Sequence, residues 1–230
     1  MNDANVSHYY GADIAEGGSR PGWYEPITPV EAIARDRWLG TFYPFQRRYL
    51  LDETRVVVLC HCRQVGASWT NAGAAVLRAT YHRIETSIYC VSFAEAIAVR
   101  DMCLRHLAIL RQLGSESCKT VSVLVRDNAV SVIANGPQVE TAVTVENLAF
   151  WKGPIVEAQS GQFRVSSSIR PDGETTLFDE FLTHQGGRSV HMAPRLVAHS
   201  EGFPLRERDL REPASDSMEF RRMFDCWTGE

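Results

Sequence analysis

The chain has 230 residues, of which 44% are hydrophobic, and this length and composition can build one folded domain with a full core. The formal net charge of -4 excludes a surface that is basic as a whole, so any contact with nucleic acid has to be local. The sequence has neither a run of about 18 apolar residues nor the zones of a signal peptide, which argues against a membrane-spanning or exported protein.

Cysteine and lysine usage adds two constraints. The six cysteines lie mostly in apolar stretches without the spacing of a secreted disulfide scaffold, so a reducing cytoplasm is expected. Only Lys119 and Lys152 are lysines among the 24 basic residues. A phosphate site that needs a lysine therefore has few sources in this chain.

Capping signals predict the first elements. Residues 1–27 are expected to be a flexible lead. Residues 28–39 are predicted to form a helix with Thr28 as its cap and Pro29 at its first position. A second helix is expected to begin at the proline of YPFQRRYLLDE and to end at about Leu51.

The middle of the chain alternates strands and helices. A strand is predicted at 56–59, a helix at about 68–79 and a second strand at 86–92. The next helix carries four apolar residues at helical spacing, namely Val99, Cys103, Leu107 and Leu110. This alternation is typical of an α/β protein with a mostly parallel central sheet flanked by helices.

The later part of the chain begins with a hairpin signal. Asn135-Gly136 lies between two alternating segments, which favours a tight turn between antiparallel strands. Residues 142–150 are nearly all apolar or β-branched before Glu146, as expected for a central buried strand. The remaining predicted elements are a strand at 162–168 and helices at 175–185 and 217–227.

Residues 61–68, HCRQVGAS, match part of the phosphate-loop pattern G-x-x-x-x-G-K-[ST]. Such a loop points backbone N–H groups at phosphate from a helix N-terminus, while its lysine adds a full charge and its hydroxyl holds magnesium. Gly66 and Ser68 are kept, but His61 replaces the first glycine and Ala67 replaces the lysine. Taken alone, the pattern fits a structural turn as well as a phosphate site.

The segments PFQRRYL and CRQVGASW resemble the start of the ATPase domain of phage terminase large subunits, the motors that package viral DNA. The resemblance implies a P-loop NTPase-like fold and a nucleotide-binding site made of Gln46, Arg63, Gln64, Gly66, Ala67 and Ser68. In that family the glutamine reads the adenine edge, and an amide has the donor and acceptor for this role. The alternative for Gln46 is an exposed helical glutamine.

Later segments extend the resemblance over about residues 42–227. VSVIANGPQVE resembles the family's hairpin, and RVSSS resembles its coupling motif, here Ser166, Ser167 and Ser168. The resemblance implies a terminase-like ATPase domain at 28–215 and a C-terminal helix or linker at 216–230. Because the chain ends where the family's nuclease domain would begin, DNA cleavage is not expected.

VTVENLAFW resembles the family's second acidic motif, and here the chemistry departs from the family. Glu146 and Asn147 stand where an aspartate holds magnesium and a glutamate polarises the attacking water, and Asn147 cannot accept a proton. The implied cofactors are ATP and Mg²⁺, with Ser68 and Glu146 as magnesium ligands. Together with Ala67, these changes predict an ATPase-type domain that binds nucleotide but hydrolyses it weakly or not at all.

Other residues offer substitutes for the missing groups. Asp179-Glu180 is a second acidic pair, but its short apolar lead predicts a solvated helix face. Lys152 follows the acidic motif, although a surface position is the simpler interpretation. Arg63 is the better candidate for phosphate binding, because its guanidinium stays charged near neutral pH and can bind phosphate oxygens in bidentate fashion.

Three further groups of residues have structural interpretations. Cys60-His61-Cys62 lacks a second ligand pair for a metal, so alternation at the end of a strand is expected. The three histidines of the later part are expected at the surface or in loops, namely His184, His191 and His199. Four arginines interleaved with acidic residues predict a mixed-charge solvated face rather than a DNA-binding patch, namely Arg195, Arg206, Arg208 and Arg211.

The resemblance also implies partners and a location. These are other terminase subunits, the portal protein and double-stranded DNA, in an oligomeric motor that works in the cytoplasm of a bacterial host and not in a membrane. Two alternatives stay open. One is a non-enzymatic scaffold or regulator derived from a terminase ATPase, and the other is an ATPase completed by a lysine or arginine of a neighbouring subunit.

Overall fold

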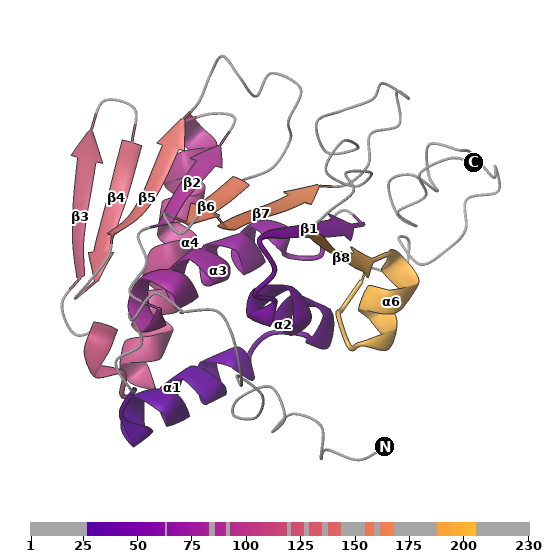
Figure 1. Cartoon of the computed structure of the whole chain (residues 1–230), viewed down its shortest axis with the longest axis horizontal. Coiled ribbons are helices and arrows are strands. Elements are labelled where there is room, and N and C mark those ends of the chain that lie inside the picture. Colours follow the sequence, from indigo (N-terminus) through magenta and orange to yellow (C-terminus); the bar gives the residue numbers. More distant parts are fainter. Residues whose placement is uncertain are drawn as a thin grey trace, which may run out of the picture.

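The computed structural model describes residues 27–62, 64–82, 86–90, 93–118, 121–126, 129–134, 138–143, 155–158, 162–167 and 188–205. These residues form an α/β arrangement in which helices pack on an eight-stranded sheet (Figure 1). The helices are α1 (Pro29–Leu39), α2 (Pro44–Leu51), α3 (Ala67–Tyr81), α4 (Phe93–Gln112), the short η3 (Glu116–Cys118) and α6 (Arg195–Ser200). The strands are β1 (Val56–His61), β2 (Thr86–Cys90), β3 (Val121–Arg126), β4 (Ala129–Ala134), β5 (Gln138–Val143), β6 (Ile155–Ala158), β7 (Gln162–Ser167) and β8 (Arg188–Ala193).

The strand order of the sheet is β3-β4-β5-β2-β6-β7-β1-β8. β1 pairs in parallel with β7 and with β8, and β2 pairs in parallel with β5. The pairings of β6 with β2 and β7, and of β4 with β3 and β5, are antiparallel. The α/β class is therefore confirmed, but the sheet is mixed rather than mostly parallel, because β6 and β4 run against their neighbours.

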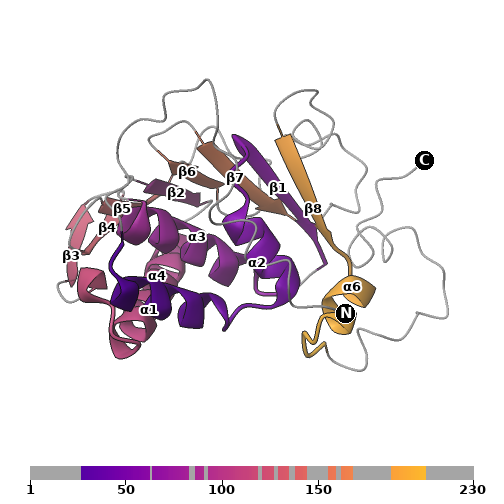
Figure 2. The ribbon, with the colours of Figure 1, turned by 60° about the horizontal axis from the view of Figure 1, so that its bottom comes forward.

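The longer helices cover one face of the sheet. Figure 2 shows α2, α3 and α4 on the same side of the strands, with α1 on the outer side of this helix layer. α3 contacts α4, β2, β6 and β7, and α1 contacts α4. The loop between β1 and α3 therefore starts from the sheet and ends in the helix layer.

The first two helices begin where the capping signals predict. The Thr28 hydroxyl accepts a hydrogen bond from the Glu31 N–H at 3.3 Å, and Pro29 occupies the first turn of α1. Tyr43 precedes α2, and its N–H donates to Oε1 of Gln46 at 3.1 Å. Both predicted helices are confirmed, as are the strands and helices expected from 56 to 112.

The second half of the chain agrees with the sequence in part. The antiparallel pairing expected on either side of Asn135-Gly136 is confirmed by β4 and β5, whereas the turn residues lie outside the described part of the chain. β7 covers most of the strand expected at 162–168. The strand expected at 142–150 is described only as far as Val143, the end of β5. β3, β6, β8 and α6 were not predicted, and the helices expected at 175–185 and 217–227 lie outside the described residues.

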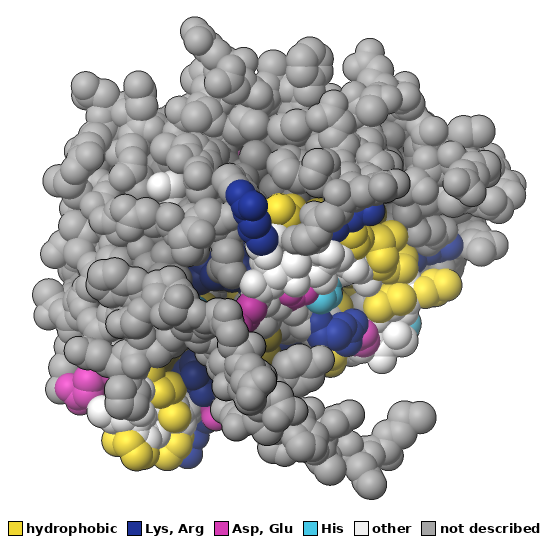
Figure 3. All heavy atoms as spheres, in the orientation of Figure 1, with side chains coloured by type: hydrophobic (Ala, Val, Ile, Leu, Met, Phe, Trp, Pro, Cys, Tyr) yellow, Lys and Arg dark blue, Asp and Glu magenta, His cyan; other side chains and the backbone are white. Residues whose placement is uncertain are grey.

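β8 escapes sequence patterning because its two faces meet different surroundings. Val190 and Met192 on one face of β8 are 37% and 44% exposed. His191 on the other face contacts Asp52, the residue that directly follows α2. Figure 3 shows hydrophobic side chains at the surface over β8 and α6, where Leu196 is also exposed. Apolar residues that face solvent, alternating with polar residues that face a helix, reverse the usual strand pattern.

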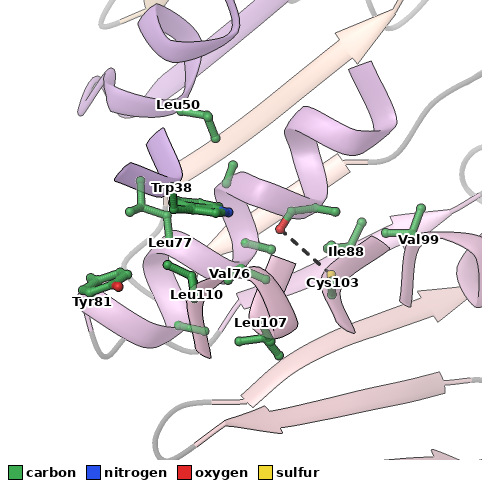
Figure 4. Packing of buried hydrophobic residues seen from close by; sticks show 14 of the residues in the cluster. Trp38, Leu50, Val76, Leu77, Tyr81, Ile88, Val99, Cys103, Leu107 and Leu110 are labelled. Atoms are coloured by element: carbon green, nitrogen blue, oxygen red, sulfur yellow. Dashed lines mark hydrogen bonds between the residues drawn. The ribbon is translucent and has the colours of Figure 1, made fainter. Parts of the chain in front are cut away.

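The larger core cluster lies between α1, α3, α4 and the sheet (Figure 4). Trp38 of α1 and Val76 of α3 are fully buried. The apolar face predicted for α4 is confirmed, since its four residues are at most 2% exposed, namely Val99, Cys103, Leu107 and Leu110. Burial of such side chains stabilises the fold by roughly 1.5–3 kcal/mol each.

A buried histidine joins this cluster to the start of α3. The Trp38 indole N–H donates to Nδ1 of His106 at 3.2 Å, so Nε2 carries the proton and donates to the Trp69 carbonyl at 3.0 Å. Burial lowers the pKa of His106 to about 4, which keeps the ring neutral. Gly73 lies against the same group, because a Cβ there would meet Cζ of Phe42 at 2.8 Å.

None of the helices in the described part of the chain combines the length and the apolar composition needed to cross a bilayer.

We expect Gly73→Ala to lower the free energy of unfolding by about 1–2 kcal/mol, measured by urea denaturation, because its methyl group would overlap the Phe42 ring. Helix propensity alone would favour alanine by about 1 kcal/mol. The sign of the change in unfolding free energy therefore separates steric overlap from helix propensity. In a Phe42→Leu background the overlapping atom is gone, and Gly73→Ala should be neutral or stabilising. Stabilisation of the parent by Gly73→Ala would contradict this packing.

Candidate functional site

The candidate site is the loop between β1 and α3, at the carboxyl end of β1. Val57, Val58 and Leu59 of β1 are fully buried between β7 and β8. At the start of the loop, the Cys62 N–H donates to the carbonyl of Ala193 on β8 at 3.1 Å. Because β7 and β8 both run parallel to β1, the carboxyl ends of three strands meet at the loop.

Two loop residues adopt left-handed backbone conformations. Gly66 precedes α3 with φ 75°, and Gln64 has φ 65°. Glycine takes such angles readily, but an ordinary residue there is uncommon and costs energy. Within the described residues, Gln64 is the one non-glycine residue with positive φ. The turn is therefore tightly specified, and Gly66 is the position that needs glycine.

The start of α3 offers backbone donors. Gly66 provides no side-chain cap, and its carbonyl accepts both the N–H and the hydroxyl of Thr70, each at 2.9 Å. The first N–H groups of any helix lack intrahelical acceptors, and the helix dipole adds partial positive charge there. Ala67 and Ser68 form the first turn and are partly exposed, so these donors suit an anion such as phosphate.

Gln46 lies behind the loop and is 3% exposed, so the alternative of an exposed helical glutamine is wrong. Its Oε1 accepts from the Tyr43 N–H at 3.1 Å, and its Nε2 donates to the Val65 carbonyl at 3.0 Å. A Cβ on Gly66 would lie 3.1 Å from the same Nε2. The glutamine that the family resemblance assigns to adenine is therefore in direct contact with the loop.

Apolar side chains pack beneath the loop. Phe45 and Val65 are at most 1% exposed and belong to the second core cluster, against which Tyr43, Ala67 and Phe203 pack. The rings of Tyr43 and Phe203 have centroids 4.9 Å apart. Ala67, which stands where the pattern has lysine, thus contributes a methyl group to an apolar cluster.

Ser166, which the family resemblance assigns to a coupling motif, is linked to α3. Ser166 is paired with Leu59 in the sheet register and is 1% exposed. Its hydroxyl accepts from the Asn71 side-chain amide at 2.6 Å, and Oδ1 of Asn71 accepts from the Tyr49 hydroxyl at 2.7 Å. These three side chains join β7, α3 and α2. Ser167 ends β7 beside Cys60, and Ser168 lies outside the described residues.

A second buried polar group on β7 holds the end of α2. The Arg164 guanidinium donates to the carbonyls of Tyr49 and Asp52 and lies over the Tyr49 ring. Burial, together with the nearby Arg78, lowers the pKa of Arg164 to about 9, so it remains charged near neutral pH. Arg164, Tyr49 and Asn71 stand out in the sequence only as polar groups within apolar segments, because their roles depend on tertiary contacts.

His191, Asp52 and Ser189 form a polar group beside α2. Nε2 of His191 lies 2.7 Å from Oδ2 of Asp52 and 3.4 Å from the Ser189 hydroxyl. A Ser-His-Asp triad uses both ring nitrogens, one for each partner. Here one nitrogen contacts both, so the arrangement is structural, and His191 lies in a strand rather than in the loop or surface position expected.

The structure leaves several predicted site residues outside its description. Arg63, Glu146, Asn147 and Lys152 are among them, as are Asp179-Glu180. The described strand that directly precedes the acidic motif in the sequence is β5, and in the sheet β5 is separated from β1 by β2, β6 and β7. Among the described residues, Gln46 contacts the loop that contains Gln64, Gly66, Ala67 and Ser68, whereas Ser166 is linked to α3 through Asn71.

The remaining candidates behave as structural residues. Cys60 and Cys62 are buried free thiols, and the described residues contain no group of His, Cys, Asp and Glu side chains that could hold a metal ion. Arg195 is 3% exposed, so its predicted place on a solvated face is wrong. His199 is exposed in α6, as expected, whereas His184, Arg206, Arg208 and Arg211 lie outside the described residues.

Comparison with known proteins does not assign a family: no protein-family model matches the chain. No curated protein and no solved structure matches it either.

The link through Asn71 predicts a non-additive pair of substitutions. Ser166→Ala removes the acceptor of the Asn71 side-chain NH₂ group, and Tyr49→Phe removes the hydroxyl that donates to Oδ1 of Asn71. Each change should lower the free energy of unfolding by about 1–3 kcal/mol. Because both act on one buried amide, the double variant should lose at least about 0.5 kcal/mol less than the sum. Ser200→Ala at the exposed end of α6 serves as control, and additive losses in urea denaturation would argue against the link.

Asp52 predicts a stability loss in acid. Burial alone would raise its pKa, but hydrogen bonds from Ser189, Thr54 and His191 outweigh burial and hold the pKa well below its usual range. A carboxyl with a depressed folded-state pKa stabilises the fold above its unfolded pKa of about 3.9, and this stability is lost as the pH falls further. Between pH 4 and pH 2, the parent should therefore lose stability more steeply than Asp52→Asn, as chemical denaturation at each pH would show. Equal slopes would contradict the assignment.

Proposed function

We propose that this chain is a P-loop-type nucleotide-binding domain related to the ATPase domain of phage terminase large subunits, and that it is impaired in hydrolysis. The observation that carries the proposal is the left-handed Gly66 turn between buried β1 and the N-terminus of α3. This geometry offers backbone donors to a phosphate chain. The resemblance of PFQRRYL and CRQVGASW to the terminase loop supports the same function.

The parallel strands beside β1 support the proposal further. β7 ends in the serine-rich segment that resembles the coupling motif, and Ser166 is hydrogen-bonded to Asn71 of the helix that starts the site. A group bound at the start of α3 would thus be connected to β7 through one side-chain amide. Such a connection suits a domain whose nucleotide state is transmitted to other elements.

The described residues fit the phosphate chain of the proposed Mg-ATP ligand better than they fit its magnesium ion. Phosphate fits the N–H groups of the first turn of α3, and ATP would supply a phosphate chain there. For Mg²⁺, Ser68 is the one proposed ligand among the described residues, because Glu146 lies outside them. Ala67 supplies no charge and Asn147 no general base, so this chain's residues can bind and orient phosphate but cannot activate water in the usual way.

The proposed setting is DNA packaging in a bacterial host. There the domain would assemble with other terminase subunits and the portal protein around double-stranded DNA. A net charge of -4 makes a local DNA contact more plausible than a basic coat.

A second candidate function is a non-enzymatic scaffold or regulator that keeps the terminase fold. The packing of Ala67 in the apolar cluster and the hydrogen bond from Gln46 to Val65 favour it, because they hold the turn without a ligand. Under this alternative the loop is a strand-to-helix connection, and the function lies in contacts with partner subunits.

Titration calorimetry with Mg-ATP and Mg-ADP tests the proposal, together with a turnover assay. We expect the parent to bind both without measurable turnover, and Ala67→Lys with Asn147→Glu to hydrolyse ATP. Lysine at the helix N-terminus opposes the dipole by about 0.3–1 kcal/mol without ligand, so Ala67→Lys alone should melt slightly earlier but gain more from nucleotide.

The other outcomes contradict one part of the proposal each. Absence of nucleotide binding in both parent and variant, with stable association with an intact packaging ATPase, would favour the scaffold. Rapid hydrolysis by the parent that depends on Ser68 would overturn impaired hydrolysis.

A further inference from the structure

The contacts of Gln46 in the structure differ from those that recognition of an adenine base would require. We infer that Gln46 is a positioning residue for the loop, and that the site recognises a polyphosphate chain without selecting adenine. This inference rests on the proposed nucleotide binding at the loop for its ligand, but its structural part concerns the loop alone. The Gln46 amide makes two hydrogen bonds, one from each end.

Both ends of the amide are used within the protein. Oε1 accepts from the Tyr43 N–H at the start of α2, and Nε2 donates to the Val65 carbonyl in the loop. Recognition of an adenine edge requires the amide oxygen and nitrogen to reach the base together. With 3% of Gln46 exposed, that edge of the side chain is closed to a ligand of this size.

The bond to Val65 sets the direction of a loop donor. The Val65 carbonyl and the Gly66 N–H belong to one planar trans peptide, in which the two groups point in opposite directions. Because the carbonyl is held towards Gln46 at 3.0 Å, the Gly66 N–H is held away from α2. Gln46 thereby orients a donor at the point where α3 begins.

Gly66 and Gln46 also fit each other sterically. A Cβ on Gly66 would come within 3.1 Å of Nε2 of Gln46, which is tighter than most real Cβ contacts. The positive φ of Gly66 and the close approach of Gln46 therefore select the same turn. A donor array fixed in this way matches phosphate oxygens, which are the same in every nucleoside triphosphate and in inorganic tripolyphosphate.

Binding of three ligands to three proteins tests the inference. Calorimetry would compare Mg-ATP, Mg-GTP and magnesium tripolyphosphate on the parent, on Gln46→Met, which keeps the volume but removes the hydrogen bonds, and on Arg47→Ala, an exposed neighbour in α2. We expect the parent to bind ATP and GTP within about threefold of each other. Gln46→Met should weaken all three ligands by a similar factor of about ten, and Arg47→Ala should weaken none. Weakening confined to ATP would overturn the inference and assign Gln46 to the base.

Hydrogen exchange without ligand gives a second readout that does not depend on the proposed function. In Gln46→Met the amides of residues 65–69 should exchange at least about tenfold faster, while those of β1 and α4 stay unchanged. If the parent binds none of the three ligands, the nucleotide proposal and the ligand class fail, but faster exchange still supports the positioning role. Unchanged exchange at residues 65–69 would overturn that role.

Discussion

Helix α2 is held at both ends by hydrogen bonds from side chains, and the shape of the candidate site depends on this attachment. At its start, Gln46 connects the backbone of Tyr43 to the loop at Val65. At its end, the buried Arg164 guanidinium donates to the carbonyls of Tyr49 and Asp52. A cation at a helix C-terminus also interacts favourably with the helix dipole, which helps to offset the cost of burying it. An eight-residue helix is too short to be stable alone, so these tertiary contacts define it.

The loop is consequently shaped by the protein rather than by a ligand. α2 fixes Val65, β8 fixes Cys62, and Gly66 supplies the left-handed turn. None of these contacts involves the position of the missing lysine. The backbone of the loop therefore does not require a charged residue at position 67, and a loop of this shape is compatible both with the proposed nucleotide binding and with a scaffold. The distinction lies in the charge available to the phosphates, not in the fold.

Local patterns predicted the elements up to Gln112 well, because caps and periodicity act within a few residues: Thr28 accepts the expected hydrogen bond, and the α4 face is buried. The arrangement of the sheet could not be predicted in the same way. β6 has four residues, too few to show a strand period, so the Ser160-Gly161 turn signal that follows it did not by itself indicate a hairpin with β7. The burial of Arg195, for which charge patterning predicted a solvated face, and of Gln46, for which exposure was the alternative, depends on tertiary contacts that local patterns do not show. The family resemblance gave no indication of the contacts that hold the loop, because these are made by side chains distant in sequence.

The buried contact between Trp69 and His106 gives this molecule an internal optical probe. Trp69 directly follows Ser68 in the first turn of α3, and its ring centroid lies 3.8 Å from that of the neutral imidazole. Indole emission responds to the polarity of its surroundings and to the charge of a neighbouring ring. A shift of the first turn of α3 by even a fraction of an ångström would alter this contact. Trp69 is one of five tryptophans in the chain, so the intrinsic fluorescence of the unlabelled protein includes a contribution that depends on the start of α3.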